Sequence, residues 1–200
     1  MVRTARFVIA AVAACLALPA WAQPPDRPAV REKAPWGALT DSVAAGEIVL
    51  RDVCLTGIAE RKPIEQLALY EWLVKMPPRS AHAGEADKVW RLASINPVYA
   101  VGWADGSCSA YVDRGPSDRL RAMAERVILA RPEGFVLASS GLVDADRVER
   151  SVYCGRAGQD RIVATITTPN GRAGQGMRAL SSTVYRARPE STLCPPSPTP

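Results

Sequence analysis

The chain is poor in the residues that build common catalytic sites. It has a single histidine, His82, and only four lysines among 25 basic residues. One histidine cannot form a multi-histidine zinc site, and no C-x-x-C pair offers thiolates. The S-x-x-K motif and the G-x-S-x-G elbow are also missing, which excludes two recognisable hydrolase classes. We therefore predict no metal and no cofactor, and lean against an enzyme.

The excess of positive charge is small. The formal net charge is +5, and the basic residues are scattered along the chain, often beside acidic ones. A nucleic-acid-binding surface needs a basic patch or stripe instead. We predict that nucleic acid is not a partner.

Three short segments resemble functional motifs without completing them. The three glycines of Asn170–Gly176 suggest a phosphate loop, but the lysine-serine ending is missing. Asp144 and Asp146 lack the rest of a twelve-residue calcium loop. Cys108, in DGSCSA, suggests a nucleophile with His82 as its base, but nothing in the sequence places the two side by side. We interpret all three segments as turns or hairpins.

The first 22 residues have the three parts of a secretory signal peptide. Arg3 and Arg6 supply positive charge, residues 7–18 form an apolar run, and an A-x-A site ends at Ala22. The apolar run is shorter than the roughly 20 residues that span a bilayer. We predict cleavage after Ala22, a periplasmic or secreted location, and no transmembrane segment in the mature chain.

A second export signal overlaps the first. Val12-Ala13-Ala14-Cys15 resembles a permissive lipobox, which would make the protein a lipoprotein anchored through Cys15. Only eight apolar residues precede this cysteine, and Leu16-Ala17-Leu18 would begin the mature chain. Pro19 also favours an extended substrate just before the A-x-A site. We favour cleavage after Ala22 and keep the lipoprotein as the alternative.

Loss of Cys15 leaves an even set of cysteines in an exported chain, which favours structural disulfides. Four cysteines allow three pairings. We favour Cys54 with Cys108, joining the first helix to a hairpin, and Cys154 with Cys194, fixing the last segment to a strand.

Proline-rich segments flank one predicted domain. Residues 23–37 form a charged, proline-rich leader, and residues 191–200 form a proline-rich tail; both compositions are typical of flexible linkers. Residues 38–190 have the size of a single domain. No internal repeat is visible in the sequence.

The pattern of the domain changes from helical to strand-like about halfway. We predict helices over residues 40–58, 63–75 and 116–130, the last with an apolar stripe that packs on a sheet. Asp105-Gly106 is typical of a type I′ hairpin turn. We predict strands over residues 98–104, 107–112, 135–143, 147–154, 161–168 and 177–186.

Short links between consecutive strands indicate antiparallel pairing. The expected class is α+β: a mainly antiparallel sheet of about five to six strands, with two to three helices packed on one face.

Four aromatic residues occur where the helical part meets the first hairpin: Trp72, Trp90, Tyr99 and Trp103. They are candidates for a groove that binds a peptide, glycan or lipid. The alternative is that they belong to the ordinary core.

An early helical cysteine, a DGSC hairpin, one amphipathic helix and several strands follow one another between Val43 and Arg186. In this order the chain resembles uncharacterised small exported proteins of Gram-negative bacteria, and this resemblance implies no active residues. We expect a non-catalytic binding or envelope-accessory protein with an unknown small ligand or envelope protein as its partner. The rival is an envelope enzyme of hydrolase type, whose site the sequence does not reveal.

Overall fold

The computed structural model describes residues 40–67, 73–77, 88–92, 97–171, 177–188 and 191–194. All of them belong to one compact unit, residues 31–200. The predicted signal peptide with Cys15, the leader, and residues 195–200 lie outside the described residues. So do Trp72 and His82.

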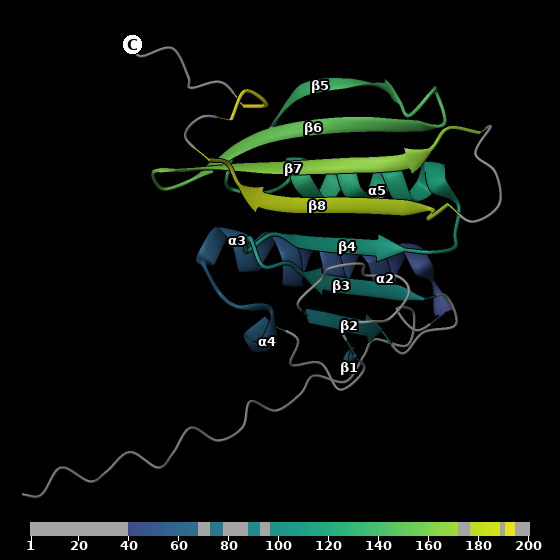
Figure 1. Cartoon of the computed structure of the whole chain (residues 1–200), viewed down its shortest axis with the longest axis horizontal. Helices are drawn as coiled ribbons and strands as arrows, with labels where there is room; N and C mark the ends of the chain where they lie inside the picture. The colour runs from purple at the N-terminus through teal and green to yellow at the C-terminus, as the bar shows by residue number, and fades with distance from the viewer. Residues whose placement is uncertain are drawn as a thin grey trace, which may run out of the picture. The chain divides into compact units, whose positions relative to one another are not determined.

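The described part of the chain forms one mixed sheet-and-helix architecture with an antiparallel sheet of eight strands (Figure 1). The strand order across the sheet is β1-β2-β3-β4-β8-β7-β6-β5, and all neighbours run antiparallel. The strands are β1 (Leu73–Met76), β2 (Lys88–Leu92), β3 (Val98–Gly102), β4 (Cys108–Val112), β5 (Val136–Val143), β6 (Val148–Ala157), β7 (Asp160–Pro169) and β8 (Leu180–Arg186).

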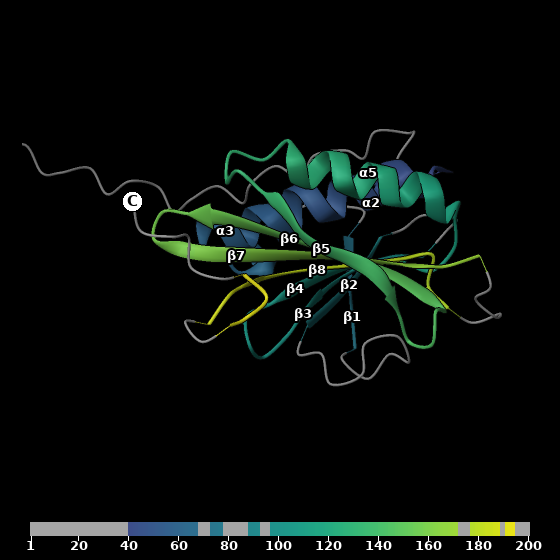
Figure 2. The same cartoon turned by 90° about the horizontal axis from the view of Figure 1, so that it is seen from above.

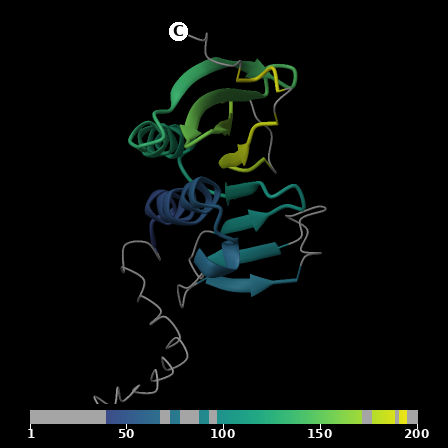
Figure 3. The ribbon, with the colours of Figure 1, turned by 90° about the vertical axis from the view of Figure 1, so that its left-hand side faces the viewer.

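Two long helical segments cover one face of this sheet (Figures 2 and 3). The first is continuous and consists of α2 (Ser42–Ile48), the π-helical segment η1 (Val49–Leu55) and α3 (Thr56–Glu60). The second is α5 (Ser117–Leu129), and a single turn, α4 (Ile64–Leu67), follows the first. We call the covered side the helix face and the other side the open face.

The same order of elements occurs twice. A helix is followed by the meander β1–β4, and then α5 is followed by the meander β5–β8. The two meanders meet through their last strands, with Ala110 of β4 opposite Ser182 of β8. The sequence shows no repeat because the repetition lies in the topology and not in the residues.

The core lies between the helices and the sheet. The predicted stripe of α5 is buried in full: Leu120, Met123, Ala124, Val127 and Ile128. Gly46 lets the first helix approach the rest of the core closely, because an added Cβ would lie 3.1 Å from Val112 Cγ2 and 3.2 Å from Met123 Cε. Packing therefore explains why this helix contains a glycine, which is otherwise unfavourable inside a helix.

The prediction of five to six strands is wrong, because the sequence analysis missed β1 and β2. The end of the predicted helix over residues 63–75 overlaps β1, Leu73–Met76, which pairs with β2 as a strand. In β2, Val89 and Trp90 are both buried although they point to opposite faces. A strand buried on both faces shows no alternation of apolar and polar residues, so the usual signal is absent.

The first predicted hairpin is present, but its turn is not of type I′. Gly106 has a φ of +80°, whereas Asp105 is not among the residues with positive φ. Gly106 N donates to Trp103 O at 2.9 Å, and Trp103 N donates to Ser107 O at 3.0 Å. These bonds fit a three-residue loop that ends in a left-handed glycine.

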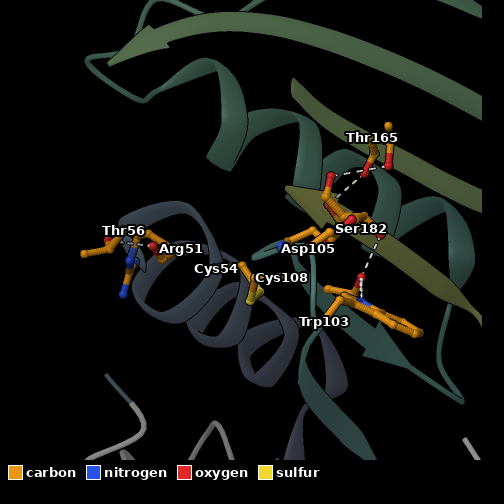
Figure 4. Close-up of a disulfide and its surroundings, with 11 residues drawn as sticks. Arg51, Cys54, Thr56, Trp103, Asp105, Cys108, Thr165 and Ser182 are labelled. Carbon is orange, nitrogen blue, oxygen red and sulfur yellow. Dashed lines mark hydrogen bonds between the residues drawn. A yellow bond between two sulfur atoms is a disulfide. The ribbon is translucent and has the colours of Figure 1, made fainter. Parts of the chain in front are cut away.

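Both disulfides form in the favoured pairing. Cys54 is bonded to Cys108 and ties η1 to β4, with Cα atoms 5.1 Å apart (Figure 4). Cys154 is bonded to Cys194 and ties β6 to residues 191–194, with Cα atoms 5.8 Å apart. The first bridge lies on the helix face, within the main core, and the second lies in a small cluster on the open face.

Candidate ligand-binding site

A cavity of about 630 Å³ lies on the open face, where the start of β5 and the end of β6 meet residues 192–194. This volume is within the range of small-molecule sites. The cavity is lined by Glu133, Gly134, Val136, Ala138, Ser139, Cys154, Gly155, Arg156, Arg161, Thr192, Leu193 and Cys194.

One wall of the cavity is the segment that ends at Cys194, and three contacts hold it over the sheet. The disulfide to Cys154 is the first. Arg161, on β7, donates from Nη1 to Cys194 O and from Nη2 to Arg188 O at 2.9 Å. Since a guanidinium binds two carbonyl groups of the segment, the wall is fixed at both ends.

The apolar part of the lining is unusually accessible. Val136 on β5 and Leu193 in the segment that ends at Cys194 are 63% and 50% exposed, and both line the cavity. Single exposed apolar residues are common on protein surfaces, but here two of them flank one concavity together with a disulfide. The arrangement suits a ligand with an apolar part.

The charged part of the lining is basic. Arg156 on β6 lies directly opposite Arg161 on β7, so both side chains point to the open face. Arg156 is exposed and makes no ion pair with any described residue. The lining acid, Glu133, is bonded to Arg131 at 2.9 Å and 3.0 Å. An anion in the cavity therefore meets arginine without an unpaired carboxylate.

Gly155 lines the cavity and also packs against the ring of Phe135. An added Cβ at Gly155 would lie 2.9 Å from ring carbons of Phe135, which is 5% exposed. The close approach of this ring to the backbone of β6 leaves no room for a side chain.

The aromatic residues of the predicted groove do not lie together. Trp90 belongs to the main core on the helix face, whereas Tyr99 and Trp103 belong to a cluster on the open face. Trp90 and Tyr99 are each 5% exposed, as expected of core residues. Of the three groove candidates that the structure describes, only Tyr99 and Trp103 lie on the same face of the sheet.

Trp103 lines a second cavity, of about 340 Å³, with Tyr111, Asp105 and hydroxyl side chains. Its polar groups bond to one another: Trp103 Nε1 donates to Ser109 Oγ at 3.0 Å, and Ser109 Oγ lies 2.8 Å from Thr183 Oγ1 (Figure 4). A ligand would have to replace these bonds, so this cavity is the weaker candidate.

Carboxylates and hydroxyl groups also gather around Arg121, at the edge of α5. Arg121 bonds to Ser151 Oγ at 2.5 Å, to Glu149 at 2.9 Å and to Glu125 at 3.1 Å. Burial, with Glu125 as a second cause, raises the pKa of Tyr153 beside them. Arg121 does not belong to the apolar stripe of α5, yet its side chain is only 15% exposed. The surrounding acceptors stabilise this guanidinium, so the cluster has a structural explanation.

No three metal-ligating side chains of the histidine, cysteine, aspartate or glutamate type lie together among the residues described. No helix in that part of the chain is long and apolar enough to cross a bilayer. Comparisons with protein-family models, curated proteins and solved structures find no match.

The disulfide between Cys154 and Cys194 in the lining of the main cavity was predicted from the sequence, but the roles of Arg156 and Arg161 were not. A signal for them was present in R-A-G-Q-D-R, residues 156–161. Gly158 and Gln159 form a two-residue loop between the paired residues Ala157 and Asp160, with φ of +61° at Gly158. A loop of this length places Arg156 opposite Arg161.

Proposed function

We propose that the protein is a non-catalytic binding module whose ligand is a small amphipathic anion. The ligand inserts its apolar part between Val136 and Leu193 and directs its anionic group toward Arg156. The observation that carries this proposal is the cavity over the Cys154–Cys194 bridge, which combines exposed apolar walls with a basic rim.

The charge of the rim supports an anion over a neutral ligand. Arg156 and Arg161 are adjacent on one face, and the guanidinium of Arg161 already binds two backbone carbonyl groups. Arg156 therefore remains to form the charge-assisted hydrogen bonds that carboxylates and phosphates make with arginine.

A binding role agrees with the chemistry of the lining. Its polar side chains are two arginines, one serine, one threonine and a glutamate paired with Arg131. Nucleophilic catalysis would need a base within hydrogen-bond reach of Ser139 or Thr192. The two disulfides support a role in an oxidising compartment outside the cytoplasm, as the predicted cleavage after Ala22 also requires.

Two detergents with the same chain and opposite head groups test the ligand class. Isothermal titration calorimetry of the oxidised protein should show binding of dodecanoate and at least tenfold weaker binding of dodecyltrimethylammonium, both below micelle formation. Arg156→Gln should weaken dodecanoate binding about fivefold or more, because the charge-assisted bonds are lost. Leu193→Ser should weaken it as well, because part of the apolar wall is removed.

The matched control is Arg119→Gln, which removes the same charge from an exposed position of α5. It should leave dodecanoate binding unchanged. Equal binding of both head groups, or an equal loss in Arg119→Gln and Arg156→Gln, would contradict the proposed site. Absence of dodecanoate binding would contradict the proposed ligand class.

A further inference from the structure

Strand β5 is an edge of the sheet, at the top of Figure 1, and no strand of the described residues pairs with its outer side. Its eight residues, VLASSGLV, carry no charge and no proline, and seven of them are exposed. An edge strand presents N–H and C=O groups that another strand can pair with, and natural edges are usually short or carry charge. The other edge, β1, has four residues and includes Lys75.

A bulge gives β5 a symmetric pattern of side chains. The register with β6 skips Ala138, so Val136 lies opposite Cys154 while Ser139 lies opposite Val152. Because of this extra residue, Val136 and Val143 point to the open face, and Leu137 and Leu142 point to the helix face. The order valine, leucine, leucine, valine is then the same from both ends of the strand.

This symmetry fits a twofold axis at Ser140. If two copies of β5 pair antiparallel with Ser140 opposite the partner's Ser140, Ser139 lies opposite the partner's Gly141. With the bulge retained, Leu137 lies opposite the partner's Leu142, and Val136 lies opposite the partner's Val143. Every pair then has both side chains on one face, as an antiparallel ladder requires. Twofold interfaces are self-complementary in this sense.

The same register is favourable for charge. Val136 pairs with Cys154, so Arg156 is level with residue 134, two positions before β5. Its backbone N–H donates to Glu133 O at 2.8 Å. In the dimer the partner's turn, which contains exposed Asp144 and Asp146, extends past Val136 to this level. The acidic turn of each copy therefore lies level with Arg156 of the other copy, with β5 between them.

We infer that the protein forms a twofold homodimer through antiparallel pairing of β5 with the β5 of a second copy, so that the eight-stranded sheets of the two chains join into one continuous sheet. The partner's Val143 then lies beside Val136 and extends the apolar wall of the cavity. This inference is argued from β5, its register and the charges beside it, and not from a bound ligand, so it stands whether or not the cavity binds an amphipathic anion.

Charges at Ser140 test the interface, because this residue meets itself across the axis. Sedimentation velocity of the oxidised protein should show a concentration-dependent dimer for the wild type. Ser140→Lys and Ser140→Asp should each be monomeric at the same concentration, because two like charges would lie directly opposite each other. An equimolar mixture of the two variants should restore the dimer, which a folding defect in either variant would prevent.

The matched control introduces the same charge at the opposite edge. Val74 on β1 is 51% exposed, and Val74→Lys should leave the dimer intact. A wild-type protein that is monomeric up to about 1 mM overturns the inference. So does a dimer that persists in Ser140→Lys, an equal loss of dimer in Val74→Lys, or a mixture that stays monomeric although circular dichroism shows that both variants are folded. Dodecanoate binding by the monomeric variants reports on the cavity separately, since its lining residues all come from one chain.

Discussion

The two halves of the molecule share an order of elements but differ in how their strands are buried. In the first half, β3 and β4 are buried at every position, and β2 is buried on both faces. In the second half, the buried residues of β7 and β8 alternate with half-buried ones over much of each strand. The same order of elements therefore buries β2, β3 and β4 on both faces in the first half. In the second half it leaves one face of β7 and β8 partly accessible.

The disulfides follow the same division. The Cys54–Cys108 bridge lies in the main core and joins a helix of the first half to the central strand β4. The Cys154–Cys194 bridge holds a surface segment on the open face and forms part of the candidate site. One bridge is placed to stabilise the fold, and the other is placed to shape a cavity.

Removal of each bridge should therefore have different consequences. The pair Cys54→Ala and Cys108→Ala should lower the free energy of unfolding by about 3–5 kcal/mol, and the pair Cys154→Ala and Cys194→Ala by about 2 kcal/mol, both measured by urea unfolding. The loops of 54 and 40 residues account for only about 0.3 kcal/mol of the difference. Most of it comes from the packing around buried Cys54 and Cys108.

Ligand binding should reverse this order. The variant without the second bridge should lose dodecanoate binding, because Leu193 is no longer fixed beside the sheet. The variant without the first bridge should bind dodecanoate at temperatures where it remains folded. Equal losses of stability, or binding that survives without the second bridge, would contradict the division of roles.

A pair of glycines sharpens the comparison at the level of packing. Gly155→Ala should destabilise the protein by about 1–3 kcal/mol, because the new Cβ meets the buried ring of Phe135 at 2.9 Å. Gly46→Ala should be nearly neutral. Its Cβ meets the terminal methyl groups of Val112 and Met123 at 3.1 Å and 3.2 Å, and alanine favours the helix by about 1 kcal/mol.

Thermal unfolding followed by circular dichroism measures both variants. A Gly46→Ala protein that is as unstable as Gly155→Ala would mean that the contact between α2 and α5 is as rigid as the Phe135 contact. Packing at the two glycines would then not distinguish the first half of the molecule from the second.

The smallest expected effect concerns the turn of the first half at low pH. Hydrogen bonds from Ser107 hold the pKa of Asp105 below its ordinary value. This lowered pKa contributes stability that is present above the unfolded-state pKa of about 3.9 and is lost as the pH falls through the folded-state value. Asp105→Asn should therefore reduce the loss of stability below about pH 4.

Ser107→Ala removes the hydroxyl donor but keeps the donating backbone N–H, so it should reduce the acid-dependent loss in part. Urea unfolding at several pH values measures it. A pH dependence that is unchanged in both variants would contradict the assignment of this contribution to the turn.

How much of the fold the sequence predicts follows from the burial of each strand. In β7, Ile162, Ala164 and Ile166 face the helices and alternate with Val163 and Thr165 on the open face, and the strand was predicted from this alternation. The fully buried β3 and β4 were predicted because Asp105-Gly106 marked a turn between them. β1 and β2 had neither signal, so the sheet was predicted with too few strands.

The candidate site was predicted only through its cysteines. The pairing of Cys154 with Cys194 followed from parity and position, but the arginines and the exposed apolar walls come from four separate parts of the chain: residues 133–139, 154–156, 161 and 192–194. The aromatic group that the sequence singled out is divided, because Trp90 and Tyr99 are neighbours of opposite parity on paired strands and point to opposite faces.

The sequence by itself determined the mixed helix-and-strand class and the stripe of α5, because periodicity is a local property, and the even number of cysteines indicated disulfides without deciding among three pairings. Only the tertiary structure decided which strand forms an edge, which face stays open and which side chains meet over the second bridge. These features depend on the order of strands in the sheet. Hydrogen bonds between segments distant in the sequence set that order, and such pairing produces no periodic pattern of residues.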